Sequence, residues 1–113
     1  MAKTIQKETQ EKISQLQMIE ETLQHYSASR QTFHSQLLEL DSSLNELSDK
    51  STAYKIIGAI MVEKTSDELR KELMDKKKTV EIRISNIEKQ EDKVKQKFES
   101  LQKEIMEDIK DSE

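Results

Sequence analysis

The sequence contains no cysteine and no proline, and it has one glycine in 113 residues. Without cysteine the chain forms no disulfide framework, cysteine-ligated zinc site or thiol nucleophile, which suits a reducing compartment such as the cytoplasm. Its longest apolar run, residues 56–62, is far shorter than the roughly 18 residues that a membrane-spanning helix needs. The first residues lack the apolar core of a signal peptide. We therefore expect a cytoplasmic protein without a membrane partner.

Aromatic residues are also scarce, at 4%, and the net charge of −4 comes from both signs mixed along the chain. A nucleic-acid-binding surface normally shows a basic surplus, so no nucleic-acid partner is expected. His25 and His34 are nine residues apart and do not share the i, i+4 face of a helical metal pair. The sequence contains no glycine-rich phosphate loop and no catalytic constellation. We expect no enzyme activity, cofactor or metal.

Leu, Ile, Val and Phe together make up 26 of the 113 residues, or about 23%, which is only just above the level that indicates disorder. Their order decides the class, because they form two long stripes in steps of three and four residues. The first stripe is Leu16, Ile19, Leu23, Tyr26, Arg30, Phe33, Leu37, Leu40, Leu44 and Leu47; the second is Leu73, Lys77, Val80, Ile84, Ile87, Glu91, Val94, Phe98, Leu101 and Ile105. This spacing is typical of the a/d seam of a coiled coil. It predicts two helices within residues 1–50 and 66–111, each with about 40 to 45 residues and therefore roughly 60 to 70 Å long.

Residues 53–64, between the stripes, lose this period and centre on the only glycine. Two short strands around a glycine turn predict a β-hairpin, because β-branched and aromatic residues favour strands and glycine permits positive φ. The hairpin residues are Tyr54, Ile56, Ile57, Gly58, Ile60, Met61 and Val62. The alternative is a helix that continues through Gly58 at a cost of about 1 kcal/mol. Thr65 and Glu68 have the spacing of a capping box, which favours a new helix start there and hence a hairpin before it.

The polar members of the seam offer a test of how the two helices pair. If the chain folds back about residue 60, opposed positions sum to about 120, which places Arg30 near Glu91 and Lys12 near Asp108. Each pair then joins opposite charges and avoids an unpaired charge in an apolar seam. We expect these two ion pairs in an antiparallel coiled coil, which would make residues 1–113 a single, mainly α-helical domain. With charges this dense, a coincidental match is the alternative.

An isolated two-stranded hairpin is marginal in water, and its edges expose unpaired backbone groups. The strands also carry apolar residues on both faces, which a solvated hairpin would not tolerate. We therefore expect several hairpins to join in a β-barrel between subunits, because closure removes the edges.

Four apolar residues near the outer ends of the predicted helices fall outside the seam: Ile13, Met18, Met106 and Ile109. One interpretation is a frayed coil end in which these residues widen the local packing. The other is an adhesive tip for non-native chains, where unbranched methionine suits irregular partners. One tip would bind weakly, but several tips on one assembly would gain avidity.

The arrangement of a long helix, the segment Tyr54-Lys55-Ile56-Ile57-Gly58-Ala59-Ile60-Met61-Val62 and a capped helix of matching length resembles the β-type subunits of prefoldin, in particular archaeal ones. The resemblance covers nearly the whole chain, and the tyrosine-lysine and aliphatic-glycine turn are its most specific part. It implies a hexamer of two α-type and four β-type subunits, joined by a double β-barrel from which six coiled coils project.

The resemblance also implies a function. Prefoldins bind non-native polypeptides without ATP at the tips of their coiled coils and pass them to a group II chaperonin. By position, the tip residues here would be Ile13, Met18, Met106 and Ile109. The alternative is a coiled-coil tether or assembly scaffold that binds folded partners and would not suppress the aggregation of denatured proteins.

Overall fold

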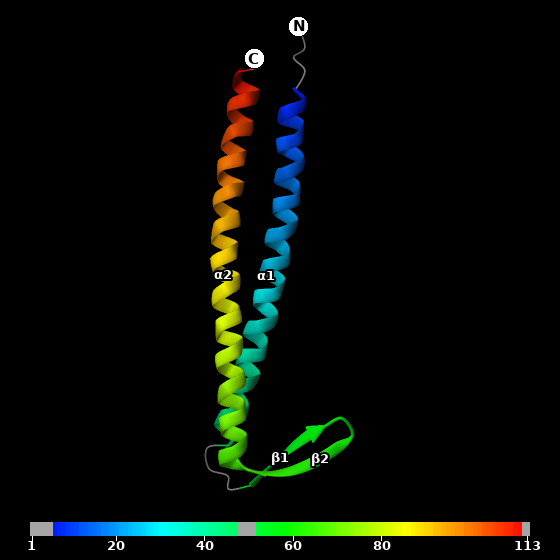
Figure 1. Cartoon of the computed structure of the whole chain (residues 1–113), viewed down its shortest axis with the longest axis vertical. Helices are drawn as coiled ribbons and strands as arrows, with labels where there is room; N and C mark the ends of the chain where they lie inside the picture. The colour runs from blue at the N-terminus through cyan, green and yellow to red at the C-terminus, as the bar shows by residue number, and fades with distance from the viewer. Residues whose placement is uncertain (1–5, 48–51, 112–113) are drawn as a thin grey trace. The chain divides into compact units, whose positions relative to one another are not determined.

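The computed structural model describes residues 6–47 and 52–111 and contains four elements in the order helix, strand, strand, helix (Figure 1). Helix α1 spans Lys7–Leu47, strand β1 Thr52–Ile57, strand β2 Ile60–Thr65 and helix α2 Ser66–Asp111. The prediction of two long helices with a central antiparallel hairpin is confirmed. The first helix was expected over residues 1–50, but Gln6 is not helical, and residues 1–5 and 48–50 lie outside the described residues.

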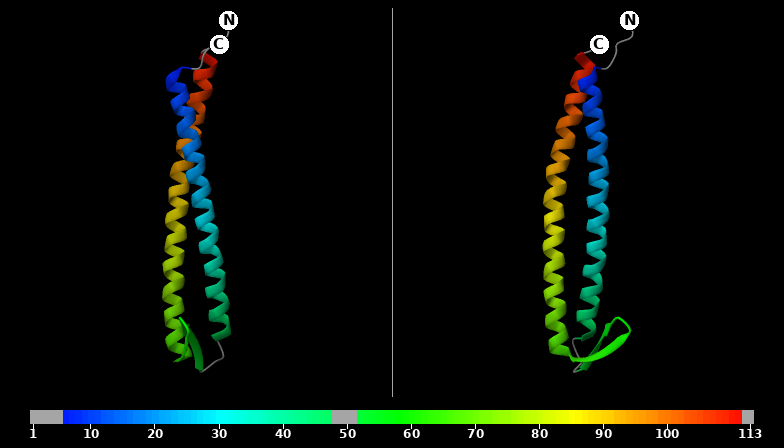
Figure 2. Two further views of the ribbon diagram at one scale, coloured as in Figure 1. Left: turned by 90° about the vertical axis from the view of Figure 1, so that its right-hand side faces the viewer. Right: turned by 45° about the vertical axis from the view of Figure 1, so that its right-hand side comes forward.

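The chain divides into two compact units, which we describe separately. The terminal unit combines Met1–Arg30 with Asn86–Glu113, and the hairpin unit is Gln31–Ser85. In the terminal unit the first part of α1 and the last part of α2 lie side by side and antiparallel, as both views in Figure 2 show. In the hairpin unit the remaining parts of the two helices flank the β1–β2 hairpin in sequence.

Both predicted stripes form the inner faces of the helices. Every one of their twenty members is buried or half-buried, whereas most of the residues between them are exposed. The most deeply buried apolar side chains are Leu47, Val80, Ile84 and Ile105, each 6 or 7% exposed. The core is thus a seam between two helices. Such a seam needs only one apolar stripe on each helix, so a chain that is only 33% apolar can form it.

Side chains and backbone groups at the helix ends explain where the helices begin. The Gln6 carbonyl accepts a hydrogen bond from the Gln10 N–H at 3.0 Å, which opens α1. Thr65 Oγ1 accepts one from the Glu68 N–H at 3.2 Å, so Thr65 is the N-cap of α2. At the other end of α1, Arg70 Nη2 donates to the Leu47 carbonyl at 3.0 Å and satisfies one of the last carbonyls of that helix.

The hairpin has a two-residue turn, Gly58-Ala59. Gly58 has a φ of 59°, whereas the φ of Ala59 is not positive. This pattern, with glycine at the first central position, is typical of a type II′ turn, whose twist matches that of the flanking strands. The strands pair from Thr52 with Thr65 to Ile57 with Ile60. Each strand is therefore six residues long, one residue longer than the expected limits at the helix-proximal end.

In the described part of the chain, neither helix has the length and apolar content needed to cross a membrane.

Candidate interaction surfaces

The first candidate surface is the hairpin. Partners across an antiparallel pair point to the same side, so Tyr54, Ile56, Met61 and Glu63 share one face. Ile56 is 70% exposed and Met61 65%, and they lie directly opposite each other on β1 and β2. Five large side chains of this segment are exposed, which we call the hairpin surface: Tyr54, Ile56, Ile57, Ile60 and Met61. Val62 is half-buried.

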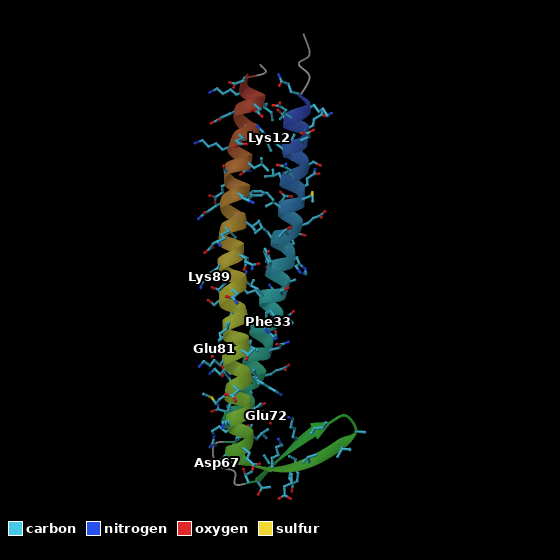
Figure 3. All side chains as sticks on the ribbon, in the orientation of Figure 1. Lys12, Phe33, Asp67, Glu72, Glu81 and Lys89 are labelled. Atoms are coloured by element: carbon cyan, nitrogen blue, oxygen red, sulfur yellow. The ribbon has the colours of Figure 1, made fainter. Side chains whose placement is uncertain are left out.

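A lysine pair ties the opposite face of the hairpin to α2. Lys55 on β1 and Lys64 on β2 both reach the carboxylate of Glu72; Lys55 Nζ donates a hydrogen bond to Oε1, and Lys64 Nζ lies 3.6 Å from Oε2. Glu72 is labelled beside the hairpin in Figure 3. The hydrogen bond from Lys55 lowers the pKa of Glu72 below its ordinary value of 4.5. One carboxylate on α2 thus holds both strands, which fixes the hairpin against the first turns of that helix.

The four predicted tip residues do not form one patch. When the seam residues are numbered as heptad positions a and d, Ile13 and Ile109 take e positions and Met106 takes a b position. In an antiparallel pair these positions lie on the same side of the seam, which we call one flank of the helix pair. Met18 takes a c position on the other flank. Ile13 is half-buried and Ile109 is 36% exposed, whereas Met18 and Met106 are 67% and 66% exposed. The two methionines are therefore the most exposed of the four side chains, one on each flank.

On the flank of Met18, the terminal unit has a groove with a volume of about 550 Å³. Its apolar lining comes from Met18 and from the seam residues Ile19, Val94 and Leu101. The polar lining residues are Gln15, Thr22 and Lys97. The groove joins both helices and carries one formal charge, that of Lys97.

The polar seam residues meet as opposite charges. Arg30 Nε donates to Glu91 Oε1 at 2.8 Å, and Arg30 Nη2 lies 3.4 Å from Oε2. Lys12 Nζ lies 2.8 Å from Asp108 Oδ2 and 3.7 Å from Glu104 Oε2 (Lys12 is labelled in Figure 3). The structure thus brings together both pairs that the fold-back register predicts, and it does so inside the terminal unit.

Sequence reasoning missed other polar contacts of the seam. Lys77, an interruption of the second stripe, lies 2.8 Å from Asp41 Oδ1, and this hydrogen bond raises the pKa of Lys77 above its ordinary value of 10.5. The two residue numbers sum to 118, so the rule that gave the other pairs would have found it. Thr9 donates to Asp108 at 3.1 Å. The contacts of Glu72 with Lys55 and Lys64 had no such signal in the sequence, because they depend on the angle between the hairpin and α2.

The Lys12–Asp108 pair predicts a pH dependence of stability. The hydrogen bond from Lys12 lowers the pKa of Asp108 below its ordinary value of 3.8, and the hydrogen bond from Thr9 acts in the same direction. A carboxyl whose pKa is lower in the folded state stabilises that state above the unfolded pKa, and the contribution disappears as the pH falls through the folded pKa. Asp108→Asn should therefore lower Tm at pH 7 by a few degrees, and its difference from the wild type should shrink below about pH 4.

Thermal unfolding followed by circular dichroism between pH 2 and 7 measures this effect. Glu107→Gln, which removes a carboxylate on the exposed side of α2, is the matched control and should show no such convergence. A difference in Tm between Asp108→Asn and the wild type that stays constant over the whole pH range would contradict the prediction.

Comparisons with known proteins agree with this geometry. A family model described as "Prefoldin subunit" matches residues 10–112. The chain is 32% identical over 101 residues to prefoldin subunit beta of Archaeoglobus fulgidus, which covers 87% of each chain. It is 33% identical over 110 residues to prefoldin subunit beta of Sulfolobus acidocaldarius, which covers 95% of this chain and 88% of the relative.

A solved structure, the crystal structure of the prefoldin beta subunit from Thermococcus strain KS-1, matches with a TM-score of 0.87 and 28% identity. The match covers 94% of this chain and 96% of that one. The similarity therefore includes both helices and the hairpin between them. The chain belongs to the prefoldin family of chaperone subunits, and it is similar in sequence and fold to the archaeal β subunits.

Proposed function

We propose that this chain is a subunit of an ATP-independent holdase that captures non-native polypeptides at the ends of its helices and passes them to a group II chaperonin. The observation that carries this proposal is the exposure of Met18 and Met106 in the terminal unit, at 67% and 66%, outside the seam of the two helices. Flexible, polarisable methionine side chains adapt to irregular apolar partners. Neither helix needs them for its own packing.

Assembly is the second part of the proposal. The family forms hetero-oligomers of α and β subunits, and the hairpin surface is too apolar for a solvated two-stranded sheet. We infer that four copies of this chain join two α-type subunits through their hairpins in the cytoplasm. Several terminal units then engage one client, which gives avidity to contacts that are weak individually.

The capture role predicts the effect of a double substitution, Met18→Ser with Met106→Ser. It removes the two exposed methionines and leaves the half-buried Ile13 in place, so the seam should remain folded. We expect the variant to lose most of its ability to suppress aggregation, measured by light scattering of an unrelated protein diluted from denaturant. Each buried methionine contributes about 1.5 to 3 kcal/mol, so the loss in affinity per terminal unit should be at least tenfold.

Met74→Ser is the matched control, because Met74 is 50% exposed but lies in the hairpin unit. It should suppress aggregation as well as the wild type does. Full activity in the double variant would contradict the assignment of the methionines. A wild-type chain that fails to protect any denatured protein would favour a tether for folded partners instead.

A further inference from the structure

The two methionines of the terminal unit lie in different surroundings. On the flank of Met106, the neighbouring e positions hold Ile13, half-buried, and Ile109, so apolar side chains there adjoin the seam. On the flank of Met18 the structure instead has the groove of about 550 Å³, with Ile19, Val94 and Leu101 in its lining. An apolar side chain of a bound segment would find an apolar lining on this flank.

The charge along the groove has one sign. Lys97 lines it from α2, and Lys93 lies one helical turn earlier on the same side. In the described parts of the chain Lys97 forms no ion pair. The residues that face it from α1, Gln15 and Thr22, are uncharged, and Thr22 Oγ1 donates to the Met18 carbonyl.

The nearest acidic residue on this flank of α2 is already engaged. Glu104 lies one heptad beyond Lys97, and its carboxylate is 3.7 Å from Lys12 Nζ. The groove therefore presents a positive charge beside an apolar lining, in a chain whose net charge is −4. A carboxylate next to an apolar side chain is the complement of this arrangement.

We propose that the groove of Met18 and Lys97 binds client segments in which a large apolar residue is flanked by Asp or Glu. The inference rests on the proposed holdase function and adds selectivity to it. The apolar side chain enters between Ile19, Val94 and Leu101, and the carboxylate pairs with Lys97. Because this pair is exposed to solvent, its effect is moderate and falls as the salt concentration rises.

Two unstructured peptides test this selectivity: one carries leucine and phenylalanine flanked by glutamate, and the other has lysine in place of each glutamate. The chain has no native cysteine, so Gln15→Cys in the full-length chain takes one environment-sensitive dye at the groove. Gln102→Cys places the same dye at an exposed e position on the other flank and serves as the control. We expect the dye at residue 15 to respond, with about threefold to tenfold tighter binding of the glutamate peptide at low salt.

Lys97→Glu should reverse this preference. Lys89→Glu makes the same charge change at an f position, on the side of α2 away from α1 (Figure 3), and should leave the preference unchanged. An unchanged preference in Lys97→Glu would overturn the inference, and so would a response confined to the dye at residue 102. A dye response that grows with chain concentration without peptide would also overturn it, because the occupant would then be a second copy of the chain.

The outcome separates this inference from the function on which it rests. If the chain suppresses aggregation but binds the two peptides equally, the selectivity of the groove is wrong and the holdase function stands. If it neither suppresses aggregation nor binds either peptide, the holdase function itself is wrong.

Discussion

Replacing Arg30 with methionine is expected to lower the free energy of unfolding by about 2 to 4 kcal/mol. Glu91 is only 5% exposed, and Arg30 supplies both of its hydrogen-bond partners in the structure. Without the guanidinium, a buried carboxylate would lose its counter-charge. The estimate lies somewhat below that for a fully buried pair because the Arg30 side chain is 34% exposed. Urea unfolding followed by circular dichroism measures the loss.

Arg83→Met provides the matched control for this prediction. Arg83 lies over the ring of Phe33 at 5.8 Å, a cation–π contact expected to contribute about 0.5 to 1 kcal/mol. A second variant combines Arg30→Met with Glu91→Leu and should recover most of the lost stability, because no buried charge then remains. Equal effects of Arg30→Met and Arg83→Met, together with no coupling between residues 30 and 91, would contradict the assigned role of the pair.

A double substitution in the hairpin, Ile56→Ser with Met61→Ser, is expected to abolish assembly at micromolar concentrations. The two side chains face each other across the strands and are 70% and 65% exposed in the single chain. Burial of each in an interface between subunits would contribute about 1.5 to 3 kcal/mol, so the pair accounts for roughly a hundredfold to a ten-thousandfold change in affinity. Size-exclusion chromatography with light scattering measures the mass.

Leu38→Ser with Met74→Ser serves as the control for the hairpin variant. Both residues are exposed and apolar, at 69% and 50%, but they lie on the helices of the hairpin unit. This variant should assemble as the wild type does. If it lost assembly and the hairpin variant kept it, the interface would lie on the helices.

Much of the fold could be predicted because its determinants are local or periodic. The seam positions follow from steps of three and four residues, and the hairpin follows from Gly58, whose positive φ suits the turn. The start of α2 follows from Thr65, which caps it. The register followed from a fold-back about residue 60, and the observed contact of Arg30 with Glu91 agrees with it.

The candidate sites were predictable only in part. The spacing showed that Ile13 and Met18 lie outside the seam, but not that the former would be half-buried and the latter beside a groove. That difference depends on which flank of the helix pair each residue occupies and on what the partner helix places opposite it. The contacts of Lys55 and Lys64 with Glu72 could not be predicted for the same reason. The strands β1 and β2 meet α2 there at an angle that no local sequence pattern encodes.

In the proposed assembly the hairpin joins the subunits and thereby gathers several client-binding ends. Native mass spectrometry of this chain mixed with an archaeal α-type prefoldin subunit measures the composition of the complex. We expect four copies of this chain with two α-type subunits, a complex that the hairpin variant fails to form. A wild-type chain that remains a monomer beside the α-type subunit, with its hairpin exposed to solvent, would contradict the proposed assembly.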